Sequence, residues 1–168
     1  INDLFDAFSV EKLNKDFFRT YKEYFEKFCD HLAKQTNYCK IFLGSTNELD
    51  KGLKDEKAKP IRDFIKKLLG RIVFLQFLQK KGWMGVPAVN TDWIGGDIKF
   101  LQNLFLTNSD QTHFHSKALR TLFFETLNSK RTNQLAPLVI GRNIKIPYLN
   151  DGLFDKDISF ENDIDFPI

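Results

Sequence analysis

A chain of 168 residues with a formal net charge of +3 has the length of one domain, which would bury roughly two-thirds of its unfolded surface. Its most apolar window, residues 68–78, is interrupted by Gly70 and Arg71, which excludes a membrane-spanning segment there and predicts no membrane partner. The two cysteines, Cys29 and Cys39, lack metal-ligand spacing. We expect reduced thiols and a cytoplasmic protein, and a short disulfide loop is the alternative.

The first predicted element is a long amphipathic helix over residues 10–36. Apolar side chains recur in it at spacings of three and four, which is the period of a helix. They are Leu13, Phe17, Tyr21, Tyr24, Phe28 and Leu32. We expect this aromatic row to be buried in a core rather than exposed as a platform on which bases stack.

Three further helices are expected after a polar connection at residues 44–59. The strongest pattern covers residues 60–81, where a proline suits the first helical position and Gly82 suits a stop. Shorter apolar repeats predict helices at residues 97–107 and 113–128. An irregular connector containing Gly and Pro precedes the first of these two.

A small β-hairpin is predicted near the end of the helical region. Residues 138–140 and 144–146 are rich in β-branched side chains, and Gly-Arg-Asn between them suits a turn. The predicted fold class is therefore mainly α, a multi-helix domain over residues 1–150 with a small C-terminal β-hairpin. An acidic segment follows at residues 151–168.

Charge is distributed unevenly along the chain. Residues 51–82 carry ten Lys and Arg against three acidic residues, and residues 113–149 carry six against one. Residues 151–168 hold six acidic residues and one Lys. Two basic blocks are typical of a surface that binds a polyanion. They are equally typical of amphipathic helices with hydrated Lys side chains, and both interpretations stay open here.

One histidine pair raises the question of a metal site. His113 and His115 lie near Asp110, but side chains two positions apart on a helix diverge by about 200°. Further ligands at a useful spacing do not follow. We therefore expect surface or capping histidines, with no metal ligands and no catalytic residues.

The run from residue 147 to residue 155 combines a strand end, a tight turn and an apolar return to the core. It resembles the Pro-Tyr-Leu-Asn-Gly-Gly-Leu-Phe-Glu signature of type IIG restriction–modification enzymes and related large DNA methyltransferases. The residues that match the signature are Pro147, Tyr148, Leu149, Asn150, Gly152, Leu153 and Phe154. Asp151 departs from the family, which usually has Gly at this position.

Three more segments are similar to this family, in the same order. Residues 8–13 lead into a helix like the family's opening helix. Residues 71–83 look like its central helix and the Lys-Gly-Trp turn that follows. Residues 119–128 resemble its Leu-Phe-Phe-x-x-Leu-Asn helix. The resemblance therefore spans about residues 8–155.

In that family the signature lies in a helical region ahead of the methyltransferase domain. The resemblance thus implies a non-catalytic connector fragment, which the start at Ile1 rather than Met also suits. The parent protein would be an S-adenosylmethionine-dependent DNA methyltransferase, with or without a Mg²⁺-dependent endonuclease. The implied partners are double-stranded DNA and the flanking nuclease and methyltransferase domains of the same chain.

The catalytic motifs of such a parent are absent from this sequence. None of the five prolines are adjacent, so the Asn-Pro-Pro-Tyr loop that holds a flipped base is missing. Residues 55–57 and 97–99 match only the short Asp/Glu-x-Lys half of a metal nuclease motif, and we expect neither to be catalytic. We expect no cofactor in this fragment.

If the connector also contacts DNA phosphates, its basic residues supply the candidates. They are Lys66, Lys67, Arg71, Lys80, Lys81, Arg120, Lys130, Arg131, Arg142 and Lys145. The alternative function is a free-standing helical protein-interaction module that docks through residues 151–168.

Overall fold

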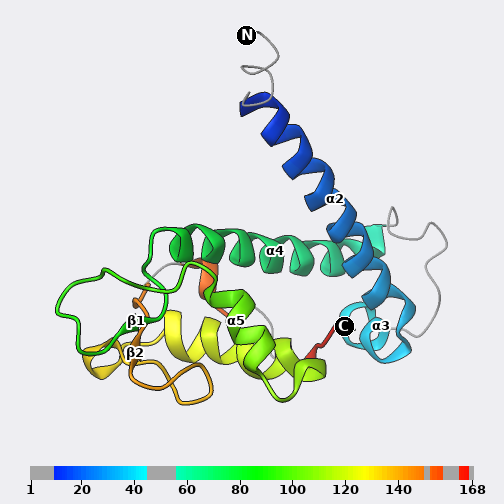
Figure 1. Ribbon diagram of the computed structural model, residues 1–168. Coiled ribbons are helices and arrows are strands. Elements are labelled where there is room, and N and C mark those ends of the chain that lie inside the picture. The colour runs from blue at the N-terminus through cyan, green and yellow to red at the C-terminus, as the bar shows by residue number, and fades with distance from the viewer. Residues whose placement is uncertain (1–9, 45–55, 150–151, 157–162, 167–168) are drawn as a thin grey trace, which may run out of the picture. The chain divides into compact units, whose positions relative to one another are not determined.

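A computed structural model of the protein describes residues 10–44, 56–149, 152–156 and 163–166, with side chains from residue 15 onward. The described chain is mainly helical with a small antiparallel sheet, which confirms the predicted fold class (Figure 1). It divides into two compact units, Ile1–Leu69 and Gly70–Ile168, which we describe separately. A separate role for residues 151–168 stays a prediction.

Some sequence predictions fall on positions outside the described residues. These positions are residues 8 and 9, the side chain of Leu13, Asp55, Asn150 and Asp151.

Unit 1 contains α2 (Val10–Lys34), α3 (Thr36–Leu43) and the first part of α4 (Lys59–Lys80). The sequence predicted one helix over residues 10–36, but the chain turns at Gln35 and continues as α3. That helix ends at Gly44, whose left-handed φ of 68° allows its N–H to bond the Lys40 carbonyl. Phe42 of α3 packs against Phe64 of α4, with ring centroids 5.4 Å apart.

The aromatic row of α2 is buried only towards its C-terminal end. Cys29 and Leu32 are fully buried, whereas Phe17, Phe18 and Tyr24 are 45%, 65% and 48% exposed. The prediction that the row is buried is therefore wrong for Phe17 and Tyr24. Helical periodicity locates an apolar stripe, but it does not show what covers the stripe.

Cys29 and Cys39 are both buried, free thiols, so the disulfide alternative is wrong. Burial raises the pKa of Cys29 to about 12 and also raises the pKa of Cys39. The Cys39 thiol donates to the Ala33 carbonyl at 2.8 Å. Thiols with raised pKa values stay protonated at neutral pH, which makes them poor nucleophiles and poor metal ligands.

Unit 2 contains the second part of α4, α5 (Phe100–Thr107) and two successive helices, η4 (Phe114–Leu119) and η5 (Thr121–Leu127). Helices were predicted at residues 97–107 and 113–128, and both are present. The second is wider than expected, because its backbone follows the π-type pattern rather than the α-type pattern. Its buried face includes Leu122 and Leu127, and both side chains are fully buried.

The sheet of unit 2 is formed by different partners from those predicted. β1 (Val86–Pro87) pairs antiparallel with β2 (Ile144–Lys145) (Figure 1). Residues 138–140 form a turn, so the predicted pairing of this segment with the next strand is wrong. The Ile140 amide donates to the Pro137 carbonyl inside this turn and is not free to join a β-ladder.

Two glycines fix the connector between α4 and α5. The Gly96 amide donates to the Gly82 carbonyl at 3.0 Å, and the Asp97 amide donates to the Met84 carbonyl at 2.8 Å. A Cβ atom on residue 96 would clash with the carbonyl oxygens of Gly82 and Met84. Only glycine therefore allows the turn after α4 and the end of the connector to approach so closely.

We predict that Leu122→Ala destabilises the protein by about 3 kcal/mol, because it leaves a cavity in a fully buried site. Leu106→Ala makes the same chemical change at a side chain that is 61% exposed, and its effect is expected to stay within about 0.5 kcal/mol. Urea unfolding of both variants measures the difference. Equal losses would show that η5 does not carry the core of unit 2.

Candidate nucleic-acid interface

Most of the predicted phosphate-contacting side chains are accessible. Those exposed to solvent are Lys66, Lys80, Lys81, Lys130 and Arg142, and those half-buried are Lys67 and Arg120. Lys66 is 3.5 Å from the Asp63 carboxylate, and Arg120 is 2.9 Å from the Glu125 carboxylate. Exposed ion pairs of this kind contribute little to stability, so they leave these cations available to a polyanion.

Arg71 lies inside unit 2, where it is only 1% exposed. Its Nε donates to the Leu153 carbonyl at 2.8 Å, and its Nη2 donates to the Asp155 carbonyl at the same distance. The guanidinium carbon also lies 5.3 Å and 5.2 Å from the ring centroids of Phe123 and Phe124. The side chain therefore joins α4 both to η5 and to the turn that carries the signature.

That turn is the short helix η7 (Gly152–Phe154), and its Phe154 side chain is fully buried. The Phe154 ring centroid lies 5.8 Å from that of Phe123 and 6.0 Å from that of Phe74. Asn128, just after η5, donates to the Asp155 carboxylate at 3.1 Å. The apolar return predicted for the end of the signature is present, and it enters an aromatic cluster.

Arg131 binds three carbonyl oxygens in the same unit. Its Nε donates to Thr126 and its Nη2 to Ile146, at 3.0 Å and 2.9 Å, and its Nη1 donates to Leu135. Partial burial lowers its pKa, but a guanidinium remains charged at neutral pH. Arg131 thus ties the chain after η5 to the residue that precedes the signature.

Lys145 is buried as well, because it is only 8% exposed. Its ammonium group donates to the carbonyls of Asn90 and Asp92, at 2.6 Å and 3.2 Å. It also lies 5.0 Å from the centroid of the Trp93 ring. These contacts hold the connector before α5 against β2.

The predicted phosphate contacts of Arg71, Arg131 and Lys145 stay predictions, but Arg71 and Lys145 are buried and all three side chains donate to backbone carbonyls. Most of these carbonyls belong to irregular chain segments, where charged N–H donors satisfy them in place of a helix or a β-ladder. The sequence did not predict this role, because a Lys or Arg in a basic block gives the same sequence pattern whether its side chain faces water or binds a loop.

Two backbone contacts place the first half of the signature. The Tyr148 amide donates to the side-chain oxygen of Gln134 at 2.8 Å. The Leu149 amide donates to the Leu127 carbonyl at 2.7 Å. Gln134 has a left-handed φ of 56°, a strained conformation for a residue with a side chain.

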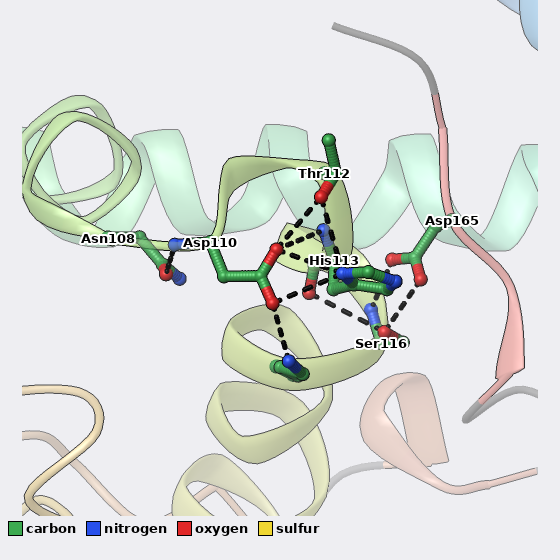
Figure 2. Close-up of polar contacts among 7 residues, drawn as sticks. Asn108, Asp110, Thr112, His113, Ser116 and Asp165 are labelled. Atoms are coloured by element: carbon green, nitrogen blue, oxygen red, sulfur yellow. Dashed lines mark hydrogen bonds and ion pairs between the residues drawn. The ribbon is translucent and has the colours of Figure 1, made fainter.

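The histidine pair does not form a metal site. The Asp110 carboxylate accepts from the Lys117 ammonium group. Figure 2 shows that it also accepts from the backbone N–H and ring Nδ1 of His113 and from the Thr112 hydroxyl. These bonds hold the pKa of Asp110 well below its usual range. His115 is buried and points elsewhere. In the part of the chain described here, no three His, Cys, Asp or Glu side chains are grouped as metal ligands.

The described end of the acidic segment is bound to η4. His115 is 2.6 Å from the Ile164 carbonyl through Nδ1, which must carry the proton because a carbonyl only accepts. Ser116 donates to Asp165 from its amide, at 2.9 Å, and from its hydroxyl, at 2.7 Å. The Asp165 carboxylate therefore satisfies an amide in the first turn of η4 and ties the described end of the acidic segment to that turn (Figure 2).

The remaining catalytic candidates also have structural roles. The Asp97 carboxylate accepts from the Lys99 amide and from the Asn103 side chain, which makes it part of the turn before α5. Gly95-Gly96, the chain's only glycine pair, packs against Gly82 and does not form a cofactor turn. These residues do not fit an S-adenosylmethionine site.

Comparisons with family models, with curated proteins and with solved structures each found no match to this chain. Within the described ranges, the helices are either too short or too polar to cross a membrane.

We predict that Arg71→Met destabilises the protein by about 3 kcal/mol, because two buried carbonyls lose their donors. Arg142→Met, at an exposed arginine, is the matched control and is expected to change stability by less than about 0.5 kcal/mol. Urea unfolding measures both effects. A tolerated Arg71→Met change would show that the signature turn does not depend on the guanidinium.

A pH dependence follows from His115, whose pKa is lowered mainly by burial and also by the charge of Arg71. The folded state holds this imidazole neutral, so the unfolded state binds more protons below the ordinary His pKa of about 6.5. Stability is therefore full above that pH and falls as the pH drops towards the folded pKa. Urea midpoints measured from neutral pH downward test this, and His115→Gln is expected to flatten the curve. An unchanged slope in the variant would assign the dependence to other groups.

Proposed function

We propose that this chain is a non-catalytic helical connector of a DNA restriction–modification methyltransferase, which positions catalytic domains and contacts DNA phosphates. The observation that carries the proposal is the environment of Arg71. Three separate segments resemble the family, namely residues 71–83, 119–128 and 147–155. They meet at this one side chain through Phe123, Phe124, Leu153 and Asp155.

The contacts among these three segments give the signature a structural role. A short motif that forms only a surface turn has few packing constraints, so it would match a family by chance more easily than a motif whose side chains fill an interior. Here Phe154 is buried in an aromatic cluster, and the carbonyls of Leu153 and Asp155 satisfy a buried cation. The three matching segments therefore depend on one another, which favours inheritance of the whole region as a unit.

The contribution to DNA binding rests on the cations that remain accessible. Among the phosphate candidates in unit 2, the exposed ones are Lys80, Lys81, Lys130 and Arg142. Residues 64–91 and 126–149, which contain them, include no acidic residue. Phosphate contacts made from such segments are sequence-blind and sensitive to salt.

The parent protein would use S-adenosylmethionine, and Mg²⁺ if it also carries an endonuclease, with both bound outside this segment. It would act on double-stranded DNA in the cytoplasm. Reading the gene on both sides of this segment tests the proposal directly. A Gly-rich cofactor turn and an Asn-Pro-Pro-Tyr-type loop downstream would support it, and a flanking sequence without either would overturn it.

We predict that the protein binds duplex DNA weakly, with an affinity that falls steeply between about 50 and 200 mM salt. The slope of the logarithm of the binding constant against the logarithm of the salt concentration measures the number of phosphate contacts. Lys80→Gln/Lys81→Gln is expected to reduce the size of this slope by about two units, because each lost phosphate contact reduces it by about one unit. Lys22→Gln/Lys27→Gln removes the same charge from exposed sites on α2 and serves as the control. Fluorescence anisotropy of a labelled duplex measures all three proteins. Equal slopes would exclude the α4 lysines from the interface.

A further inference from the structure

Both tryptophans of the chain line one cavity of unit 2, which has a volume of about 340 Å³. Its walls are Trp83, Trp93, Gln134, Pro147, Tyr148 and Leu149. They come from the turn after α4, the connector before α5, the chain after η5 and the first half of the signature. The volume lies within the range of about 300–1,000 Å³ that is typical of ligand pockets.

Backbone contacts hold the aromatic walls in place. The Trp83 amide donates to the Leu78 carbonyl at 3.1 Å, which fixes the first wall to the end of α4. Trp93 is held by Lys145, whose ammonium group lies over its ring and binds the carbonyls on either side of residue 91. The backbone of Tyr148 is held by Gln134. These contacts fix the chain segments that carry the aromatic walls.

Gln134 places a hydrogen-bond donor in this aromatic wall. Its Oε1 accepts from the Tyr148 amide, so the orientation of the side-chain amide is set and Nε2 is the free end. Within the described residues, Nε2 donates to no other group. An acceptor on a ligand in the cavity would meet these N–H groups.

The charge around the cavity favours an anionic ligand. Residues 80–87 and 126–149 supply five of the six walls and contain six Lys and Arg without an acidic residue, and Asp92 precedes the sixth wall, Trp93. Arg131 and Lys145 donate to carbonyls, which leaves Lys80, Lys81, Lys130 and Arg142 as the exposed cations of these segments. The Lys145 ammonium already lies against the Trp93 ring, so a second cation such as a quaternary ammonium group would be repelled. A proline-rich peptide would use the aromatic walls but would gain nothing from the surrounding positive charge.

We propose that this cavity binds an unpaired base of single-stranded DNA, with the base ring against the aromatic walls and a base-edge acceptor bonded to Gln134 Nε2. Aromatic stacking beside cationic groups is the usual way in which proteins hold single strands. The inference goes beyond the duplex phosphate contacts of the proposed function and rests on that function only for the presence of DNA.

The two tryptophans make the test direct, because base stacking quenches indole fluorescence. The full chain is titrated with an oligothymidylate of about ten nucleotides and with an abasic oligomer of equal length, which keeps the phosphates and sugars. We expect the oligothymidylate to quench the fluorescence and to bind about tenfold more tightly than the abasic oligomer.

Variants then locate the effect. Trp83→Ala removes a wall that is already 42% exposed, and it is expected to abolish the preference for the base-containing oligomer. Gln134→Glu keeps the oxygen that accepts from the Tyr148 amide but removes the N–H donor. It is expected to reduce the ratio of the affinity for the oligothymidylate to the affinity for the abasic oligomer. Phe18→Ala changes an exposed aromatic residue in unit 1 and is expected to leave the ratio as it was.

Each result decides between the proposals. Quenching by the oligothymidylate alone, with the preference for it lost in Trp83→Ala and reduced in Gln134→Glu, supports base binding. Equal binding of both oligomers without quenching overturns base binding and leaves the phosphate contacts of the proposed function in place. Binding of neither oligomer nor duplex overturns both. Quenching by a proline-rich decapeptide but not by either oligomer would assign the cavity to a peptide and overturn the inference.

Discussion

The interior of unit 2 depends on a buried positive charge. Removing a guanidinium from water is costly unless its N–H groups are satisfied, and Arg71 meets that condition with the carbonyls of Leu153 and Asp155 and the faces of two phenylalanine rings. The consequence runs in both directions. The turn supplies acceptors to the cation, and the cation fixes a segment that has almost no regular secondary structure. Phe154 can then enter the aromatic cluster, because the backbone on both sides of it is bonded.

The same arrangement recurs at Arg131 and Lys145. Arg131 donates to the carbonyls of Thr126, Leu135 and Ile146, and Lys145 donates to those of Asn90 and Asp92. A carbonyl bonded to a charged donor is well satisfied. The basic character of this region therefore has two origins. Some cations hold the chain together, and others remain on the surface, where they are available to an anionic partner.

The helices were largely predictable from the sequence, because apolar period and glycine stops are local signals. The pattern over residues 60–81 corresponds closely to α4, and the mainly α class follows from such patterns. What failed depended on distant partners. The strand at residue 144 pairs with Val86–Pro87, almost 60 positions earlier, and no short-range signal marks that pairing. The burial of Arg71 was unpredictable for the same reason, since its acceptors lie more than 80 residues away. The aromatic cavity was not predicted either, because its walls come from four separate segments.

The position of Arg71 along the chain also constrains the order of folding. Its acceptors lie 82 and 84 residues downstream, so closing this contact carries the entropy cost of a long loop. During synthesis, α4 emerges well before the turn whose carbonyls accept hydrogen bonds from the Arg71 guanidinium. Until residue 155 has been made, burying the guanidinium is unfavourable, and the aromatic cluster lacks Phe154. Folding of unit 2 therefore has to finish late, when the end of the signature returns to a helix formed near its beginning.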